Sequence, residues 1–193
     1  MWRTNKKMKL SILLLLSSIL LSFSASPGKR TAATDKAYIE RFAPIAISEM
    51  RRYKIPASIT LAQAILESNG GMSELARKHN NHFGVKCYEQ HCEDGHCINY
   101  HDDTPKDHFK RYPSAWESFR DHSLFLQKSW YAPLYELPAT DYKAWAEGLA
   151  KSGYAADKKY AQKLIKVIEK YDLAKYDAQG VKKSGKVRLM IGG

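Results

Sequence analysis

Residues 56–71 read PASITLAQAILESNGG and predict one apolar helix that ends at a pair of glycines. Pro56 suits the first turn of a helix, because the N–H that proline lacks would have no partner there. Apolar side chains then recur at helical spacing, at Ile59, Ala62, Ile65 and Leu66. The sequence at 68–71 stops the helix. Glu67 is therefore expected at the C-terminal end of an apolar helix.

This position has chemical consequences for Glu67. A carboxylate there lies at the negative end of the helix dipole and is partly desolvated by its apolar neighbours, and both effects disfavour ionisation. We therefore expect a raised pKa. A general acid needs such a pKa to stay protonated near neutral pH and to donate its proton to a leaving oxygen. The structural alternative is an ordinary exposed glutamate in a last helical turn.

The flanking segments are mostly helical, and their starts are marked by a proline or by a capping side chain. The expected helices run from Pro44 to about 53, from Glu74 to Lys78, from Ser114 to about Lys128, from Thr140 or Asp141 to just before Gly153, and from Asp157 through Tyr171. Residues 97–100 and 108–112 have the pattern of short strands on either side of a turn at 102–105. We expect an α+β domain, mostly α, over residues 36–173, with a β-hairpin lobe inserted in its middle.

The two ends of the chain differ from this domain in composition. Residues 1–25 hold four basic and no acidic groups ahead of and around an apolar run at 10–21, which is typical of an export signal. The run is short for a membrane span, although a retained N-terminal anchor is the alternative. We expect a linker at 26–35 and an exported mature protein, in the periplasm, the cell envelope or outside the cell, with no integral membrane span. Residues 174–193 are basic, lack periodicity and predict a disordered tail.

The charge distribution bears on the class of partner. The formal net charge is +11, but residues 26–173 carry only +3, so most of the excess lies at the ends of the chain. A nucleic-acid-binding face would concentrate that charge in the folded part. We therefore expect no nucleic-acid partner.

Three cysteines, Cys87, Cys92 and Cys97, lie close together with His91 and His96. In an oxidising compartment they predict one disulfide and one leftover thiol, and the spacing leaves the pair open. Free thiols are one alternative. A zinc site is another, but the C-x4-C-x4-C spacing lacks the paired C-x2-C motifs of structural zinc sites. We expect no metal and no cofactor.

Four ordered blocks of this sequence carry a resemblance to a known family. They are AQAILESNGGMSELA at 62–76, NNHFGVK at 80–86, FKRY at 109–112 with Ser114 and Glu117, and SGYAAD at 152–157 with Tyr160. Together they resemble the glucosaminidase domain of glycoside hydrolase family 73, over residues 36–173. The resemblance implies a lysozyme-like helical domain with the β-hairpin lobe beside an active-site cleft. It also implies cleavage of the N-acetylglucosaminyl-β-1,4-N-acetylmuramyl bond, an endo-β-N-acetylglucosaminidase activity, with peptidoglycan glycan strands as partner. We expect a monomer.

The resemblance also assigns roles to residues. Glu67 matches the family's catalytic acid, and Tyr154 matches an active-site aromatic residue. The expected substrate-binding residues are Ser68, Asn81, Phe83, Gly84 and Lys86. From the residues alone, Tyr154 could equally be exposed after a helix-stopping glycine, and Phe83 could be a core aromatic. Gly70 departs from the common family form, which often has an aromatic residue there as one wall of the sugar groove.

The second catalytic carboxylate is expected in the β-lobe. Asp102 and Asp103 are the best candidates, and Glu89, Glu93 and Asp94 are in reserve. Plain turn formation is their alternative role, because aspartate favours such positions. A separation of about 6.5 to 9.5 Å from Glu67 would leave room for water and invert the anomeric centre. A second route uses the substrate's own 2-acetamido oxygen, held by Tyr154.

Two rival functions remain open from the sequence. A muramidase or lytic transglycosylase shares a Glu-Ser pair at a helix end but cuts the other linkage. A non-catalytic protein that binds the cell wall could keep the same fold. The identity of the sugar at the newly formed end distinguishes the two enzyme classes.

Overall fold

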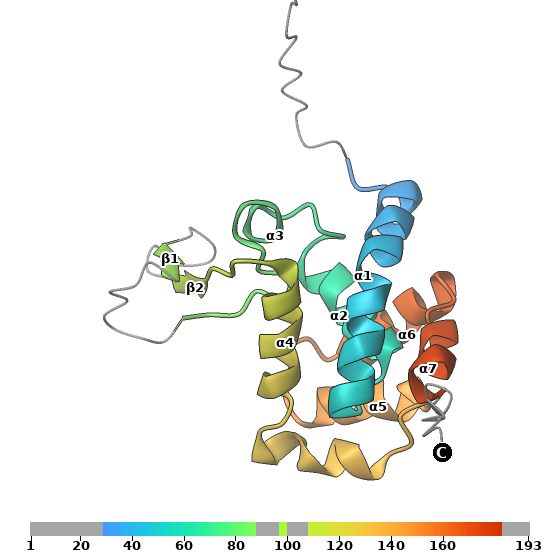
Figure 1. Ribbon diagram of the computed structural model, residues 1–193. Helices are drawn as coiled ribbons and strands as arrows, with labels where there is room; N and C mark the ends of the chain where they lie inside the picture. The colour runs from blue at the N-terminus through green and yellow to red at the C-terminus, as the bar shows by residue number, and fades with distance from the viewer. Residues whose placement is uncertain (1–28, 88–96, 100–107, 183–193) are drawn as a thin grey trace, which may run out of the picture.

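The computed structural model describes residues 29–87, 97–99 and 108–182, and in these ranges the chain is mostly helical (Figure 1). The elements are α1 (Ala32–Tyr53), α2 (Ala57–Glu67), α3 (Glu74–His79), β1 (Cys97–Asn99), β2 (His108–Lys110), α4 (Ala115–Phe125), a 3-10 helix η1 (Ser129–Glu136), α5 (Tyr142–Lys151), α6 (Tyr160–Lys170) and α7 (Ala174–Val181). The expectation of a mostly α domain with a small β-lobe is confirmed.

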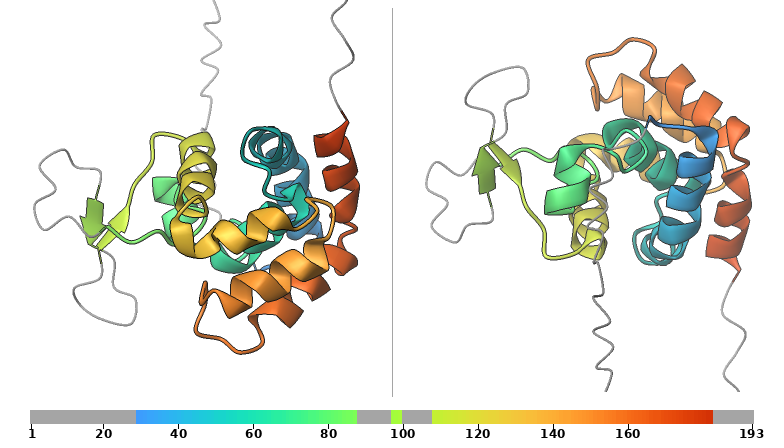
Figure 2. Two further views of the ribbon diagram at one scale, coloured as in Figure 1. Left: turned by 90° about the horizontal axis from the view of Figure 1, so that it is seen from below. Right: turned by 90° about the horizontal axis from the view of Figure 1, so that it is seen from above.

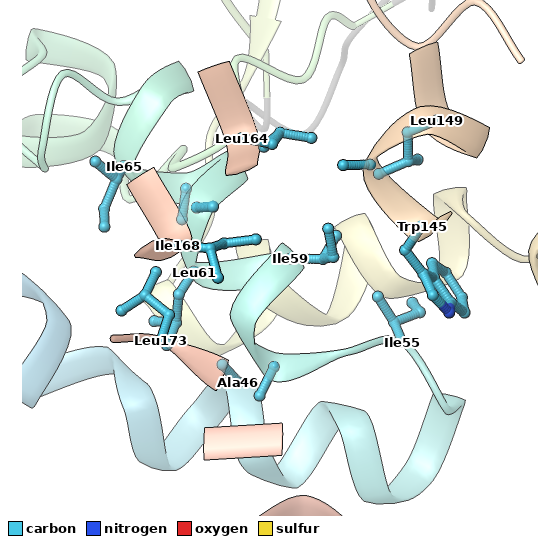
Figure 3. Packing of buried hydrophobic residues seen from close by; sticks show 14 of the residues in the cluster. Ala46, Ile55, Ile59, Leu61, Ile65, Trp145, Leu149, Leu164, Ile168 and Leu173 are labelled. Carbon is cyan, nitrogen blue, oxygen red and sulfur yellow. The ribbon is translucent and has the colours of Figure 1, made fainter. Parts of the chain in front are cut away.

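Helix α2 lies at the centre of the core. Its residues from Ala57 to Ile65 are all buried, and most of them are apolar, as expected for a helix in the core. It packs against α1, α5, α6 and α7. Figure 3 shows Ile59 and Ile65 of α2 among side chains of α5 and α6, including Trp145 and Leu164. Because α2 is held on all sides, the residue at its C-terminal end has a fixed position.

Helix α1 begins earlier than the sequence predicts. It starts at Ala32, because Thr31 and Thr34 form a capping box in which the N–H of each residue donates to the hydroxyl of the other, at 2.9 and 3.2 Å. The prediction that Pro44 opens this helix is therefore wrong. Pro44 lies inside α1 on its exposed side, where water can satisfy the carbonyl that proline leaves unpaired. The expected linker at 26–35 thus runs into a helix at its C-terminal side.

The hairpin forms as expected. Strands β1 and β2 are antiparallel, with Ile98 opposite Phe109, and the hairpin stands to one side of the helical body in both views of Figure 2. A disulfide joins Cys87 to Cys97 and so ties β1 to the segment after α3. This confirms the expected disulfide and identifies the pair. Cys92 lies outside the described residues, and within those residues no cluster of metal-ligating side chains occurs.

The second half follows the predicted caps closely. Ser114 and Asp141 cap α4 and α5, where each side chain accepts a backbone N–H. Helix α4 ends at Phe125 rather than near Lys128, and η1 follows it. The prediction that Asp157 caps the next helix is wrong: Asp157 accepts from the N–H of Lys159 at 2.8 Å, but α6 begins at Tyr160 and its N-cap residue, Lys159, makes no side-chain cap hydrogen bond.

Residues 174–181 correct the prediction of a disordered tail. They form α7, which packs against α1 and α2. Asp177 is buried and accepts hydrogen bonds from the N–H and the hydroxyl of Ser58, at 2.8 and 2.6 Å. These bonds satisfy the start of α2, which has no side-chain cap of its own. Residues 183–193 lie outside the described part of the chain.

The expected export signal at 1–25 also lies outside the described residues. Among the helices that the structure does describe, none combines the length and the apolar character that a membrane crossing requires.

Candidate active site

Glu67 is the last residue of α2, as the sequence predicts, and it is exposed to solvent. The hydroxyl of Tyr160 donates a hydrogen bond to its Oε1 at 2.9 Å. Tyr160 is buried at the start of α6, and its hydroxyl accepts from Nε2 of Gln63 at 3.2 Å. Since Gln63 supplies the donor to the Tyr160 oxygen, the Tyr160 proton is directed at Glu67. One carboxylate oxygen of Glu67, Oε1, is thereby fixed. Among the described residues, no hydrogen bond involves the other oxygen, Oε2.

The electrostatics of Glu67 agree with the sequence-based expectation. Desolvation by the surrounding protein raises the pKa of the carboxyl above its usual value, and the Tyr160 hydrogen bond and the positive charge of Lys163 act in the opposite direction. Desolvation is thus the dominant cause, although solvent reaches the side chain. A carboxyl with this balance is protonated over a wider pH range than an ordinary glutamate.

Tyr154 lies directly beside this pair. It follows α5 after Gly153, which adopts a positive φ of 74°. Its ring stacks on that of Tyr160 with centroids 5.4 Å apart and an interplanar angle of 21°. Burial raises the pKa of Tyr154 most, and the negative charge of Glu67 raises it further. The structure therefore brings Tyr154 and Glu67 together, with Tyr154 as a protonated phenol.

The turn after Glu67 is built by close packing. The Ser68 hydroxyl is buried, donates to the carbonyl of Ala64 at 2.5 Å and accepts from the N–H of Gly71 at 2.7 Å. A side chain at Gly71 would overlap the ring of Tyr38, so glycine is required there. The predicted substrate-binding residue Ser68 is thus used by the chain itself to form the turn.

The other predicted groove residues divide into two groups. Asn81 is buried and connects the loop to the hairpin, since its amide donates to the carbonyls of Val85 and Lys110 at 3.0 and 2.8 Å. Phe83 is also buried. Gly84 is partly exposed with a positive φ, and Lys86 is exposed. Gly84 and Lys86 therefore lie at the surface, whereas Asn81 and Phe83 are buried beneath it.

Phe83 is held by aromatic packing. Its ring stacks on His122 with centroids 4.0 Å apart and meets Phe119 edge-on at 5.0 Å. Burial lowers the pKa of His122 to about 3, so this ring is neutral and packs as an aromatic. His122 also meets Tyr154 edge-on at 6.2 Å. Phe83 is therefore packed as a core aromatic residue, which was the alternative expected from the residues alone. Through His122 it is connected to Tyr154.

Sequence reasoning missed the roles of Gln63 and Tyr160. Gln63 lies four residues before Glu67, which puts both on one side of α2, and it is a polar residue in an otherwise apolar segment. That spacing was a usable signal for Gln63. Tyr160 was part of the resemblance, but its hydrogen bond to Glu67 depends on how α6 packs against α2.

The proposed second carboxylates, Asp102 and Asp103, lie outside the described residues, as do the reserve candidates Glu89, Glu93 and Asp94. Within the described residues, the groups that shift the pKa of Glu67 are Tyr160 and Lys163. Neither is a carboxylate, and the assignment of Asp102 or Asp103 as the second catalytic carboxylate stays a prediction.

Comparisons with known proteins agree with this geometry. Residues 43–173 match the family described as glucosaminidase, mannosyl-glycoprotein endo-beta-N-acetylglucosaminidase. The chain is 43% identical to the exo-glucosaminidase LytG of Bacillus subtilis over 138 residues, which are 65% of this chain and 48% of LytG. It is 31% identical to a probable N-acetylmuramidase of Lactococcus lactis over 175 residues, which are 82% of this chain and 38% of the relative. The chain thus spans about half or less of the length of these two proteins.

A solved structure supports the same fold. The catalytic domain of the autolysin Auto from Listeria monocytogenes is similar with a TM-score of 0.61 and 30% identity. The similarity covers 77% of this chain and 90% of that domain.

Proposed function

Because this chain belongs to the glucosaminidase family of peptidoglycan glycoside hydrolases, we propose that it cleaves the N-acetylglucosaminyl-β-1,4-N-acetylmuramyl bond of peptidoglycan, with Glu67 as general acid. The observation that carries the proposal is the hydrogen-bonded pair of Glu67 and Tyr160 at the end of α2, with Tyr154 stacked on Tyr160. It combines an exposed carboxyl of raised pKa with a fixed orientation.

In this proposal Glu67 protonates the leaving glycosidic oxygen. Tyr160 occupies Oε1, so the proton to be transferred resides on Oε2, which points away from that hydrogen bond. As the glycosidic bond breaks, the carboxyl becomes a carboxylate. The Tyr160 hydrogen bond and the charge of Lys163 both stabilise that ionised form. The residues that lower the pKa of Glu67 therefore also favour the transition state.

The other half of the reaction has two routes. In the first, Asp102 or Asp103 acts as a base for an attacking water and inverts the anomeric centre. In the second, the 2-acetamido oxygen of the substrate attacks, and the Tyr154 phenol donates a hydrogen bond that orients it. The protonated state of Tyr154 beside Glu67 supports its role as a donor.

We also propose that the protein acts in the cell envelope as an exported monomer that binds glycan strands through Gly84 and Lys86. The basic and apolar pattern of residues 1–25 supports export. Peptidoglycan lies outside the cytoplasmic membrane, so the proposed substrate requires the same location.

The name of the Lactococcus relative, a probable N-acetylmuramidase, favours cleavage of the other linkage as a second candidate function. The two are distinguished by digesting purified peptidoglycan, reducing the products with borohydride and identifying the reduced sugar by mass spectrometry. Reduced N-acetylglucosamine supports the proposal, and reduced or anhydro muramic acid would replace it with the second candidate. Absence of fragments would favour a non-catalytic wall-binding protein. Product length tests the endo mode, because an exo-acting enzyme releases only terminal units.

A further inference from the structure

A hollow lies beside the turn that follows Glu67. It has a volume of about 420 Å³ and is formed by α1, by the Gly70–Gly71 turn, by α3 with the loop after it, and by the start of α4. Figure 1 shows these three helices around the upper part of the molecule. Glu67, Tyr154 and Tyr160 do not line it. We call it the α1–α3 cavity. Its size is within the range of cavities that hold small molecules.

The α1–α3 cavity is positively charged. Arg41 of α1 and Arg77 of α3 are among its lining residues, and no aspartate or glutamate is. Among the described residues, neither arginine forms an ion pair or a side-chain hydrogen bond. Arg41 only lies over the Phe42 ring, at 5.2 Å. Two guanidinium groups from different helices therefore line one hollow, and none of the described residues that line it is acidic.

The nearest carboxylates are engaged elsewhere. Asp35, below Gly70, is paired with Arg30 at 2.8 Å and accepts from the hydroxyl of Tyr171 at 2.6 Å. Glu74, one turn before Arg77 on α3, pairs with Lys78 at 2.6 Å. The charge of Arg77 also acts on Glu74, so Arg77 has an acidic neighbour outside the lining, and Arg41 forms no ion pair with any described residue.

The inner wall of the cavity is polar and neutral. The hydroxyl of Tyr38 is 2.8 Å from Nδ1 of His82, and both residues are buried and line the cavity. Burial and the nearby Arg41 lower the pKa of His82 to about 4, so its ring is neutral at pH 7. Arg41 also acts on the pKa of Tyr38, which places its charge near this wall. The buried part of the lining thus presents the polar atoms of Tyr38 and His82, and the positively charged Arg41 and Arg77 are solvent-exposed.

We propose that the α1–α3 cavity binds a carboxylate or phosphate group of a cell-envelope polymer, with Arg41 and Arg77 as its charged ligands. A guanidinium binds either oxyanion through two parallel hydrogen bonds, and two such groups on separate helices can hold one anion from both sides. The volume accommodates the end of a peptide or a sugar-phosphate-sized unit in addition to the anionic group. This site is separate from the proposed hydrolytic residues, and the choice of an envelope polymer as the source of the anion rests on the proposed function.

The test is a binding titration followed by the backbone amide signals of Gly70, Gly71 and Ala76, which line the cavity. The probes are N-acetyl-D-alanyl-D-alanine for a peptide carboxylate and glycerol phosphate for a polymer phosphate. The amide-blocked peptide and glycerol are their uncharged controls. We expect saturable shifts with one or both charged probes and none with the uncharged ones. The probe that binds more tightly identifies the source of the anion.

Variants separate this site from unspecific charge attraction. Arg41→Gln and Arg77→Gln should each weaken binding about tenfold, because each removes a charge-assisted hydrogen-bonding group. Arg52→Gln removes the same charge from an exposed position of α1 outside the cavity and should leave binding unchanged. Shifts that do not saturate, or equal losses in all three variants, would overturn the proposal. Binding is measured without glycan cleavage, so a failure of the proposed hydrolysis would leave this result unaffected.

Discussion

Replacement of Tyr160 by phenylalanine tests how the proposed acid is tuned. The Tyr160 hydroxyl donates to Oε1 of Glu67 at 2.9 Å and lowers the pKa of that carboxyl against the larger effect of desolvation. Phenylalanine removes the donor and keeps the ring that stacks on Tyr154. Tyr160→Phe should therefore raise the pKa of Glu67 further, and the basic limb of the pH–rate profile should move to higher pH.

The size of the shift follows from hydrogen-bond energies. A hydrogen bond to an ionised group contributes about 1.5–3 kcal/mol, and one to a neutral group contributes about 1 kcal/mol. The difference stabilises the ionised form of Glu67 by roughly 0.5–2 kcal/mol, and the middle of this range corresponds to about one pH unit. The same loss should act on the transition state, in which Glu67 becomes ionised, so the maximal rate should fall by about tenfold.

The assay is kcat/KM for solubilised glycan strands as a function of pH. Tyr135→Phe is the matched control, because its hydroxyl is hydrogen-bonded to Gln127 and to the carbonyl of Leu126, outside the Glu67 site. We expect an unchanged basic limb in the control and a limb about one unit higher in Tyr160→Phe. A limb that stays in place or moves to lower pH in Tyr160→Phe would refute the reasoning.

Three further predictions concern stability. Burial raises the pKa of Asp177 to about 6, so the contribution of Asp177 to the free energy of unfolding should grow as the pH falls from 7 to 4. Urea titrations should show this gain in the wild type and not in Asp177→Asn. Reduction of the Cys87–Cys97 disulfide should cost about 2–3 kcal/mol in the same assay, and a double serine variant should be insensitive to reductant. Gly71→Ala should lower the free energy of unfolding by more than Gly84→Ala, because both positions have positive φ and only Gly71 faces the Tyr38 ring; equal losses would contradict the overlap.

Much of the helical layout could be read from local signals. The apolar helix before Gly70, the caps at Ser114 and Asp141 and the hairpin strands are set by residues within a few positions of one another. The start of α1 was missed because a threonine capping box is a weaker signal than Pro44, and an exposed proline is tolerated inside a long helix. Local signals therefore predicted element type better than element ends.

Helix α7 could not be predicted for a different reason. Its segment is short and carries one lysine and one aspartate, and it is stabilised by packing on α1 and α2 and by the bond between Asp177 and Ser58, residues 119 positions apart. The sequence of the α7 segment alone does not indicate that Ser58 is its partner. The role of Asp177 follows only from the structure, in which the start of α2 has no side-chain cap of its own.

The candidate active site likewise has features that local sequence predicts and features that depend on tertiary packing. The position and raised pKa of Glu67 were predictable from the end of an apolar helix, and the active-site role that we propose for Tyr154 rests on the resemblance. The contact of Tyr160 with Glu67 depends on the crossing of α2 and α6, which sequence periodicity does not determine. Ser68, Asn81 and Phe83 were assigned to substrate because of their motif, and the structure shows that their polar atoms or rings are used within the protein.

The most direct test of the account is the rate at which Glu67→Gln solubilises purified peptidoglycan, compared with Glu147→Gln, which removes an exposed carboxyl of α5. Glutamine keeps the size of the side chain and has no proton to donate to the leaving oxygen. We expect a loss of about 100- to 10,000-fold for Glu67→Gln and none for Glu147→Gln. Activity of Glu67→Gln at the level of the control would contradict the central claim that Glu67 is the general acid.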